Sequence, residues 1–255
     1  MTSGHGALLG VLAVLPAVLL VRYFHTRDPH PRGKRFTRVV FYGGIALLVA
    51  VGPVFLWGSR RLLDWAVFGL LDVPPDPAAI ALVNSLLMVA LPEESLKLLV
   101  LLAIAGHRRL FSQRADGLAY GAMVALGFAV LENVAYVANG ELKVAMMRTV
   151  TAVPAHAVFG AILGYYLAQA MRPGRRRLIW QGLAFAVVLH ATYDFPLMGL
   201  NEATRLPYAP LSSMDVWVAL ALTVPAAVVM LGAVWVWFAL HDLEEPHSVA
   251  AASLR

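Results

Sequence analysis

Seven apolar runs divide this chain of 255 residues and constrain its fold more than any other feature. A helix needs roughly 20 apolar residues to cross a bilayer core of about 30 Å, and most of the runs reach that length. Hydrophobic residues make up 60% of the chain, whereas soluble domains are nearer to about 45–50% apolar. The sequence therefore predicts an all-α fold, a polytopic membrane helical bundle. The expected transmembrane helices cover approximately residues 7–21, 39–57, 78–105, 117–138, 144–170, 178–200 and 216–240.

One stretch between the second and third spans has a different pattern. In residues 58–77, Leu62 and Leu70 fall on one side of a helical wheel, and Arg60 and Arg61 fall on the other. Such a segregation is typical of a helix that lies in the membrane interface. We therefore expect about seven transmembrane helices plus a short interfacial helix, all in a single transmembrane domain over residues 1–240.

The basic residues indicate how the spans are oriented. Fourteen of the 20 Lys and Arg residues fall on one side of the predicted membrane, in residues 22–38, 107–116, 171–177 and the C-terminal tail. Four fall on the other side. Because cytoplasmic loops carry an excess of Lys and Arg, we expect an outside N-terminus and a cytoplasmic tail over residues 241–255. The protein is thus predicted to be a multi-pass protein of the cell membrane, and its Arg-, Ala- and Val-rich composition favours a bacterial source.

Composition also excludes some kinds of chemistry and partner. The chain has no cysteine, so disulfides, thiolate metal sites and a cysteine nucleophile are excluded. The net charge of +5 is accounted for by the basic loops, and we expect the lipid bilayer as a partner and no nucleic acid.

Three charged residues interrupt the third apolar run. Glu93, Glu94 and Lys97 lie in the middle of residues 78–105. A charge near the bilayer centre costs about 2.5–3.5 kcal/mol on insertion scales, so such residues face a protein interior or a wet cavity. An ionisable group in a membrane span is therefore a candidate for function.

The next three spans carry matching polar groups, whereas the first, second and seventh carry essentially none. The matching residues are Glu132, Asn133, Arg148, His156, His190 and Asp194. With a rise of about 1.5 Å per residue, Glu93, Glu132, His156 and His190 all fall near the middle of the membrane. Four spans therefore place ionisable groups in one layer, which predicts a single site in the catalytic spans, about residues 78–200.

Four short patterns occur in order on these spans and resemble a known family. They are Glu93-Glu94-x-x-Lys97, Phe128-x-x-x-Glu132-Asn133, His156-x-x-x-Gly160 and His190-x-x-x-Asp194. The set resembles the PrsW family of intramembrane proteases, which is related to the CAAX-prenyl endopeptidases and to bacteriocin-processing membrane proteases. The resemblance implies an intramembrane protease, generally classed as a metalloprotease. It also implies that the substrate is a membrane protein or peptide, anti-sigma factors included.

The residue types fit hydrolysis of a peptide bond. A glutamate can take a proton from water and later deliver it, and Glu93 is the preferred base with Glu94 as the alternative. Two imidazoles and a carboxylate can hold a catalytic zinc ion with one open position. We assign His156 and His190 as metal ligands or oxyanion donors, with Glu132 or Asp194 completing the site. The predicted metal set is His156, His190 and Glu132, with Zn²⁺ as the expected cofactor.

Structural roles compete with some of these assignments. Asn133 is expected to bind the substrate backbone or to orient Glu132. Arg148 is a candidate for substrate binding, but a structural counter-ion to Glu132 or Glu141 is the more common role of such a residue. Small residues also recur at intervals of four on two spans, which is typical of close helix packing. They are Gly117, Gly121 and Ala125 on one span and Gly160 and Gly164 on the other.

A transporter or proton relay is the alternative function. Buried Glu, His and Asp residues also mark ion paths through membranes. Transporters often contain internal repeats, and no convincing repeat relates the two halves of this chain. The protease interpretation is therefore preferred.

Overall fold

The structure, a computed structural model, describes residues 3–27, 34–65, 76–105, 114–139, 142–205 and 211–244. Its elements are α1 (Ser3–Arg27), α2 (Lys34–Leu63), α3 (Pro77–Val83), the π-helical segment η2 (Asn84–Ala90), α4 (Leu91–Ala105), α5 (Arg114–Ala138), α6 (Leu142–Val150), α7 (Ala152–Ala170), α8 (Arg177–Arg205) and α9 (Leu211–Glu244). Within these ranges the chain forms helices and no strand, so the all-α prediction is confirmed.

Three described helical stretches are long and apolar enough to cross a membrane. They are Arg114–Ala138, Arg177–Arg205 and Met214–Ala239. Two pairs, Val40–Ala46 with Leu48–Leu62 and Lys143–Val150 with Ala152–Ala170, raise the number to five if each pair, bent by 45°, is one span. The stretch from α3 to α4 is continuously helical but carries the Glu93, Glu94 and Lys97 charges. The chain is thus a membrane helical bundle with three to five span candidates by length and composition.

The fifth predicted span is broken into α6 and α7 at Thr151. Pro154 lies in the first turn of α7, where it has no N–H to offer to the carbonyl of Val150. The backbone hydrogen bonds continue on both sides of the break, from Thr151 N to Met147 O and from Ala155 N to Thr151 O, each at 3.1 Å. The proline therefore accounts for the bend without a loss of helix on either side.

Two predictions at the ends of helices need correction or lie outside the described residues. The interfacial helix expected from residue 58 does not begin there, because α2 continues through Arg60 and Arg61 in its last turn. Basic side chains at a helix C-terminus favour such a continuation, since they complement the helix dipole. Residues 66–75 lie outside the described part of the chain. The predicted tail begins inside α9, which runs to Glu244, and its remainder, 245–255, also lies outside the described residues.

The centre of the bundle is the contact between α5 and α7. A Cβ atom added to Gly121 would meet the backbone carbonyl of Gly160, and one added to Gly164 would meet that of Gly117. The two backbones therefore touch with no side chain between them, as the series of small residues predicts. This packing places Glu132 and His156, which lie on α5 and α7, in adjacent helices of the core.

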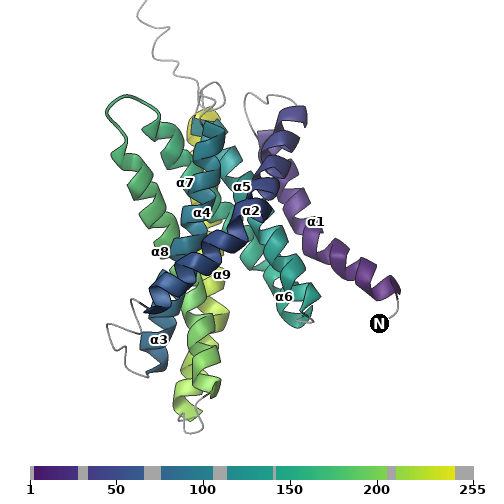
Figure 1. Cartoon of the computed structure of the whole chain (residues 1–255), viewed down its shortest axis with the longest axis vertical. Coiled ribbons are helices and arrows are strands. Elements are labelled where there is room, and N and C mark those ends of the chain that lie inside the picture. Colours follow the sequence, from purple (N-terminus) through teal and green to yellow (C-terminus); the bar gives the residue numbers. More distant parts are fainter. Residues whose placement is uncertain are drawn as a thin grey trace, which may run out of the picture.

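The remaining helices surround this pair. Figure 1 shows α2 crossing the bundle obliquely, with α1 and α6 diverging on one side of α5. On α9, Leu222, Met230 and Leu231 are 67–71% exposed. Large apolar side chains with that exposure fit a surface in contact with lipid.

Candidate functional site

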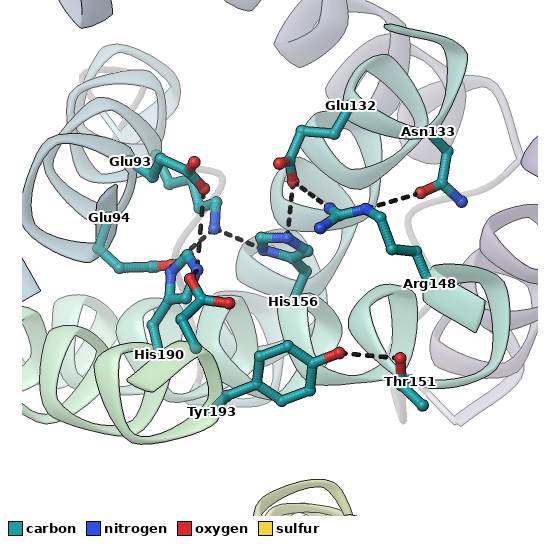
Figure 2. Close-up of polar contacts among 11 residues, drawn as sticks. Glu93, Glu94, Glu132, Asn133, Arg148, Thr151, His156, His190 and Tyr193 are labelled. Atoms are coloured by element: carbon teal, nitrogen blue, oxygen red, sulfur yellow. Dashed lines mark hydrogen bonds and ion pairs between the residues drawn. The ribbon is translucent and has the colours of Figure 1, made fainter. Parts of the chain in front are cut away.

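The predicted site residues meet in one cavity of about 250 Å³. Glu93 comes from α4, Glu132 from α5, Arg148 from α6, His156 from α7, and His190 and Asp194 from α8; all six line the cavity. Figure 2 shows His156 in the middle of the group, between the two α4 carboxylates and the pair formed by Glu132 and Arg148. Glu94 and Asn133 are fully buried and do not line the cavity.

Lys97 joins Glu94 to His156. Its ammonium donates to Glu94 Oε1 at 2.6 Å, and it lies 2.8 Å from Nδ1 of His156. It also lies over the ring of Phe128, 4.7 Å from the centroid. Lys97 and Glu94 are both 0% exposed, so their charges compensate each other in the apolar interior. Lys97 thus pairs with Glu94.

Both ring nitrogens of His156 are engaged. Nδ1 faces Lys97, and Nε2 lies 2.8 Å from Glu132 Oε2. Because an ammonium has donors and no acceptor, Nδ1 of His156 accepts the hydrogen bond from Lys97. Nε2 then carries hydrogen and donates to Glu132, which assigns the tautomer of this imidazole.

Glu132 is held from two directions. Arg148 Nη2 donates to Glu132 Oε2 at 2.8 Å, and Arg148 Nε donates to Asn133 Oδ1 at 3.2 Å. The guanidinium carbon also lies 4.7 Å from the ring centroid of Tyr136. Arg148 therefore forms the counter-ion contact with Glu132 that the sequence predicted. Asn133 positions Arg148, and substrate binding by either residue stays a prediction.

His190 lies among three carboxylates. Its Nδ1 is 2.8 Å from Glu94 Oε1, and its Nε2 is 3.2 Å from Asp194 Oδ2 and 3.9 Å from Glu93 Oε2. The ring of Phe159 stacks on the imidazole, with centroids 5.1 Å apart and an interplanar angle of 20°. Asp194 thus orients His190 through the four-residue spacing seen in the sequence.

The two neighbouring glutamates occupy different environments. Glu94 Oε1 accepts hydrogen bonds from both Lys97 and His190. Oε2 of Glu93 and Oε2 of Glu94 are both buried without a hydrogen-bond partner, but only Glu93 lines the cavity. Since an unpaired buried carboxylate oxygen is costly, Glu93 has the capacity to bind a proton, a water molecule or a metal.

Glu93, His156 and His190 form the group best suited to a metal. One ligand atom from each lies within 4.8 Å of the others. Two imidazoles and one carboxylate match the three protein ligands of many catalytic zinc sites. Oε2 of Glu93 has no hydrogen-bond partner and can ligate, whereas a metal would replace one contact of each imidazole, because both ring nitrogens of His156 and of His190 are engaged. Glu132, the third ligand predicted from the sequence, is held by Arg148 and His156, and its role as a ligand stays a prediction.

The sequence reasoning missed Tyr193 and Thr151. The hydroxyl of Tyr193 donates to Thr151 Oγ1 at 2.8 Å, and Thr151 donates to the carbonyl of Met147 at 2.9 Å. These bonds tie α8 to the bend between α6 and α7, and Tyr193 also lines the site cavity. A tyrosine beside Asp194 was the one signal available, and nothing in its spacing indicated the partner.

Comparison with known proteins identifies one family. A family model described as PrsW family intramembrane metalloprotease matches residues 35–230. A curated protein of Shouchella clausii named Protease PrsW is 32% identical over 197 residues, which are 76% of this chain and 85% of that protein. A protein of the same name from Clostridioides difficile is 33% identical over 198 residues, 74% of this chain and 79% of that protein. The comparison with solved structures finds no significant match.

Proposed function

Because this chain belongs to the PrsW family of intramembrane metalloproteases and is therefore a protease, we propose that the cavity around Glu93, His156 and His190 is its hydrolytic site. The proposed reaction is the hydrolysis of a peptide bond in or near the membrane. The observation that carries the assignment is that Glu93, whose Oε2 atom has no hydrogen-bond partner, lines the same cavity as both imidazoles.

Glu93 is the proposed general base. Its free carboxylate oxygen accepts a proton from a water molecule while the water oxygen attacks the carbonyl carbon of the substrate. As the tetrahedral centre collapses and the C–N bond breaks, Glu93 returns that proton to the leaving amine. Glu94 is the proposed positioning residue, because it accepts hydrogen bonds from Lys97 and His190 and does not line the cavity.

The imidazoles are proposed to stabilise the negative charge that develops on the carbonyl oxygen. His190 is oriented by Asp194 and Glu94, and His156 is held between Lys97 and Glu132. Groups fixed in advance by such contacts need little reorganisation when charge develops, which is the source of their catalytic effect. Glu132, in turn, is fixed by Arg148.

Zinc is the proposed cofactor, held by His156, His190 and one carboxylate oxygen of Glu93. It would supply a Lewis acid that polarises the scissile carbonyl and makes water more acidic. A carboxylate that ligates through one oxygen keeps the second oxygen to accept a proton.

For topology, we propose that the chain crosses the membrane about seven times, once each through α1, α2, the stretch from α3 to α4, α5, the bent pair of α6 and α7, α8 and α9. The asymmetry of Lys and Arg between the loops supports an outside N-terminus and a cytoplasmic C-terminus. Residues 1–240 would then be one transmembrane domain.

The proposed substrate is a membrane protein, and an anti-sigma factor is the candidate implied by the family resemblance. The test reconstitutes the purified full chain in liposomes with single-span peptides and measures cleavage. Wild type is expected to cut at least one such peptide, and the variant with both Glu93→Gln and Glu94→Gln is expected to be inactive. Cleavage that survives both changes contradicts the mechanism.

A further inference from the structure

A second cavity adjoins the site cavity at the end of α8. It has a volume of about 210 Å³ and lies between α2, η2 and α8; we call it the vestibule. Arg60, Val89 and Met198 line both the vestibule and the site cavity. The two spaces are therefore neighbours that share one wall. The vestibule extends from the catalytic cluster toward the side of the membrane at which α8 ends.

Away from this junction the vestibule is lined by Met88 and by four polar or charged residues. Asn84, Asn201, Glu202 and Arg205 line it, and Asn201 and Arg205 are exposed. Hydrolysis consumes water, so a buried site needs a path that water can enter, and polar side chains stabilise water in such a path. The polar side chains of the vestibule could stabilise water in this way.

A larger cavity, by contrast, shares no lining residue with the site cavity. It has a volume of about 650 Å³, lies between α3, η2, α8 and α9, and is lined almost entirely by apolar side chains such as Leu82, Phe195 and Val224. None of its lining residues lines either of the other two cavities. An apolar hollow of this kind suits lipid or an apolar helix and does not conduct water.

Arg60 is the cation at the junction. Arg205 is paired with Glu202 at 3.1 Å, and the neighbouring Arg61 lies over the ring of Trp57 at 5.9 Å. The guanidinium of Arg60 has no hydrogen bond or ion pair with any residue that the structure describes. It is nevertheless one wall of the cavity that holds Glu93 and both histidines. A guanidinium there, without a partner among the described residues, is suited to a carboxylate, which it binds with two parallel hydrogen bonds.

We propose that the vestibule is the aqueous entrance to the catalytic cavity, and that Arg60 at its inner end binds a carboxylate side chain of the substrate close to the cleaved bond. This inference rests on the proposed hydrolytic function and adds a preference for acidic residues in the substrate. It also assigns a specificity role to α2, which carries none of the predicted catalytic residues.

The entrance can be tested without a substrate, because the chain has no cysteine and each introduced thiol is the only one. The full chain in liposomes is treated with two thiosulfonate reagents of similar size, one with a sulfonate and one with a trimethylammonium group. Asn84→Cys and Asn201→Cys are expected to react with both reagents, since both positions line the vestibule. Thr192→Cys is the control and is expected to react little, because it is exposed at the apolar cavity, which suits lipid rather than water. Unreactive thiols at positions 84 and 201 overturn the proposed entrance.

The charge of Arg60 is tested by the ratio of the two labelling rates at Asn84→Cys. At low salt we expect the anionic reagent to react several-fold faster, and Arg60→Gln to remove most of that preference. Arg61→Gln is the matched control, because it removes the same charge from the adjacent position and is expected to leave the ratio unchanged. A ratio that does not respond to Arg60→Gln overturns the assignment of Arg60.

The substrate preference is tested with single-span peptides that carry Asp, Asn or Lys beside the cleaved bond. Wild type is expected to show the lowest KM for the Asp peptide, and Arg60→Gln to raise that KM several-fold with little change for the Asn peptide. If Arg60→Gln changes the KM of all three peptides equally, the preference for an acidic residue is overturned. Failure of wild type to cut any peptide contradicts the hydrolytic function, while the labelling ratio still decides the entrance.

Discussion

Lys97 of α4 and His156 of α7 face each other across the core, with Nζ and Nδ1 only 2.8 Å apart. The same ammonium donates to Glu94. One fully buried cation therefore links Glu94 of one helix to an imidazole of another. Because an ammonium is only a donor, this contact also directs the N–H of His156 toward Glu132.

The first prediction concerns Lys97→Met. Removal of one partner of a buried ion pair leaves an uncompensated charge, so we expect the free energy of unfolding to fall by about 3–5 kcal/mol. The measurement is thermal unfolding of the purified protein in detergent. Combining Lys97→Met with Glu94→Gln is expected to recover part of the loss. If the double variant loses more unfolding free energy than the two single variants lose together, the assigned pair is contradicted.

The second prediction separates the two glutamates. Glu93→Gln is expected to lower the cleavage rate by about 10²–10⁴-fold, the usual contribution of a general base, with little change in thermal stability. Glu94→Gln is expected to lower stability as well as rate, because its carboxylate accepts from Lys97 and His190. Both quantities are measured on the same preparations. If the Glu93→Gln enzyme is stable and fully active, Glu93 is not the general base and Glu94 becomes the candidate.

The third prediction concerns Arg148→Lys. A lysine keeps the charge but cannot donate in fixed directions to both Glu132 and Asn133. Loss of a hydrogen bond to a charged group costs about 1.5–3 kcal/mol, so kcat is expected to fall roughly ten- to a hundredfold. Arg172→Lys, at an exposed position after α7, serves as the control and should retain wild-type kcat. A pure rise in KM would instead indicate direct substrate binding by Arg148.

The fourth prediction tests the contact between α5 and α7. The new side chain in Gly121→Val would collide with the carbonyl of Gly160, and overpacking of this kind costs about 1–3 kcal/mol or more. Activity should fall with stability, since Glu132 and His156 are carried by these helices. Gly58→Ala is the matched control: its Cβ would meet nothing within 4 Å, so stability should be unchanged or slightly higher.

The fifth prediction concerns the metal. We expect wild type to bind about one zinc ion per chain, and His156→Ala and His190→Ala each to lose it, because three protein ligands are needed for a tight catalytic site. Metal content is measured after purification without chelators and again after dialysis with a defined zinc concentration. Glu132→Gln should retain the metal if Glu93 is the third ligand. Loss of zinc in that variant would restore the set predicted from the sequence.

The sequence was sufficient to predict that the candidate catalytic residues lie together. Hydropathy locates span ends, and the constant rise of a helix converts positions such as Glu93, His156 and His190 into depths. Residues four apart, such as His190 and Asp194, also share a helix face. These two regularities account for the correct prediction that the groups meet.

Partner choice was not predictable in the same way. Lys97 is four residues from Glu93 and three from Glu94, and both spacings permit a pair on a helix. The rotation of α4 against α7 and α8 decides between them, and it depends on contacts 59 and 96 residues apart in sequence. The pairing of Tyr193 with Thr151 likewise depends on the bend at Pro154. The end of α2 lies beyond the end predicted for the second span, because the basic residues of its last turn prolong the helix.

The glycine contact has a consequence for how this enzyme meets different membranes. Glu132 and His156 sit on helices whose backbones touch directly, so their separation is set by main-chain contact rather than by deformable side chains. A thinner or thicker bilayer must be accommodated by tilting of the outer helices, with α1 and α9 moving before the central pair. We therefore expect Glu132 and His156 to keep their relative geometry in bilayers of different lipid chain length.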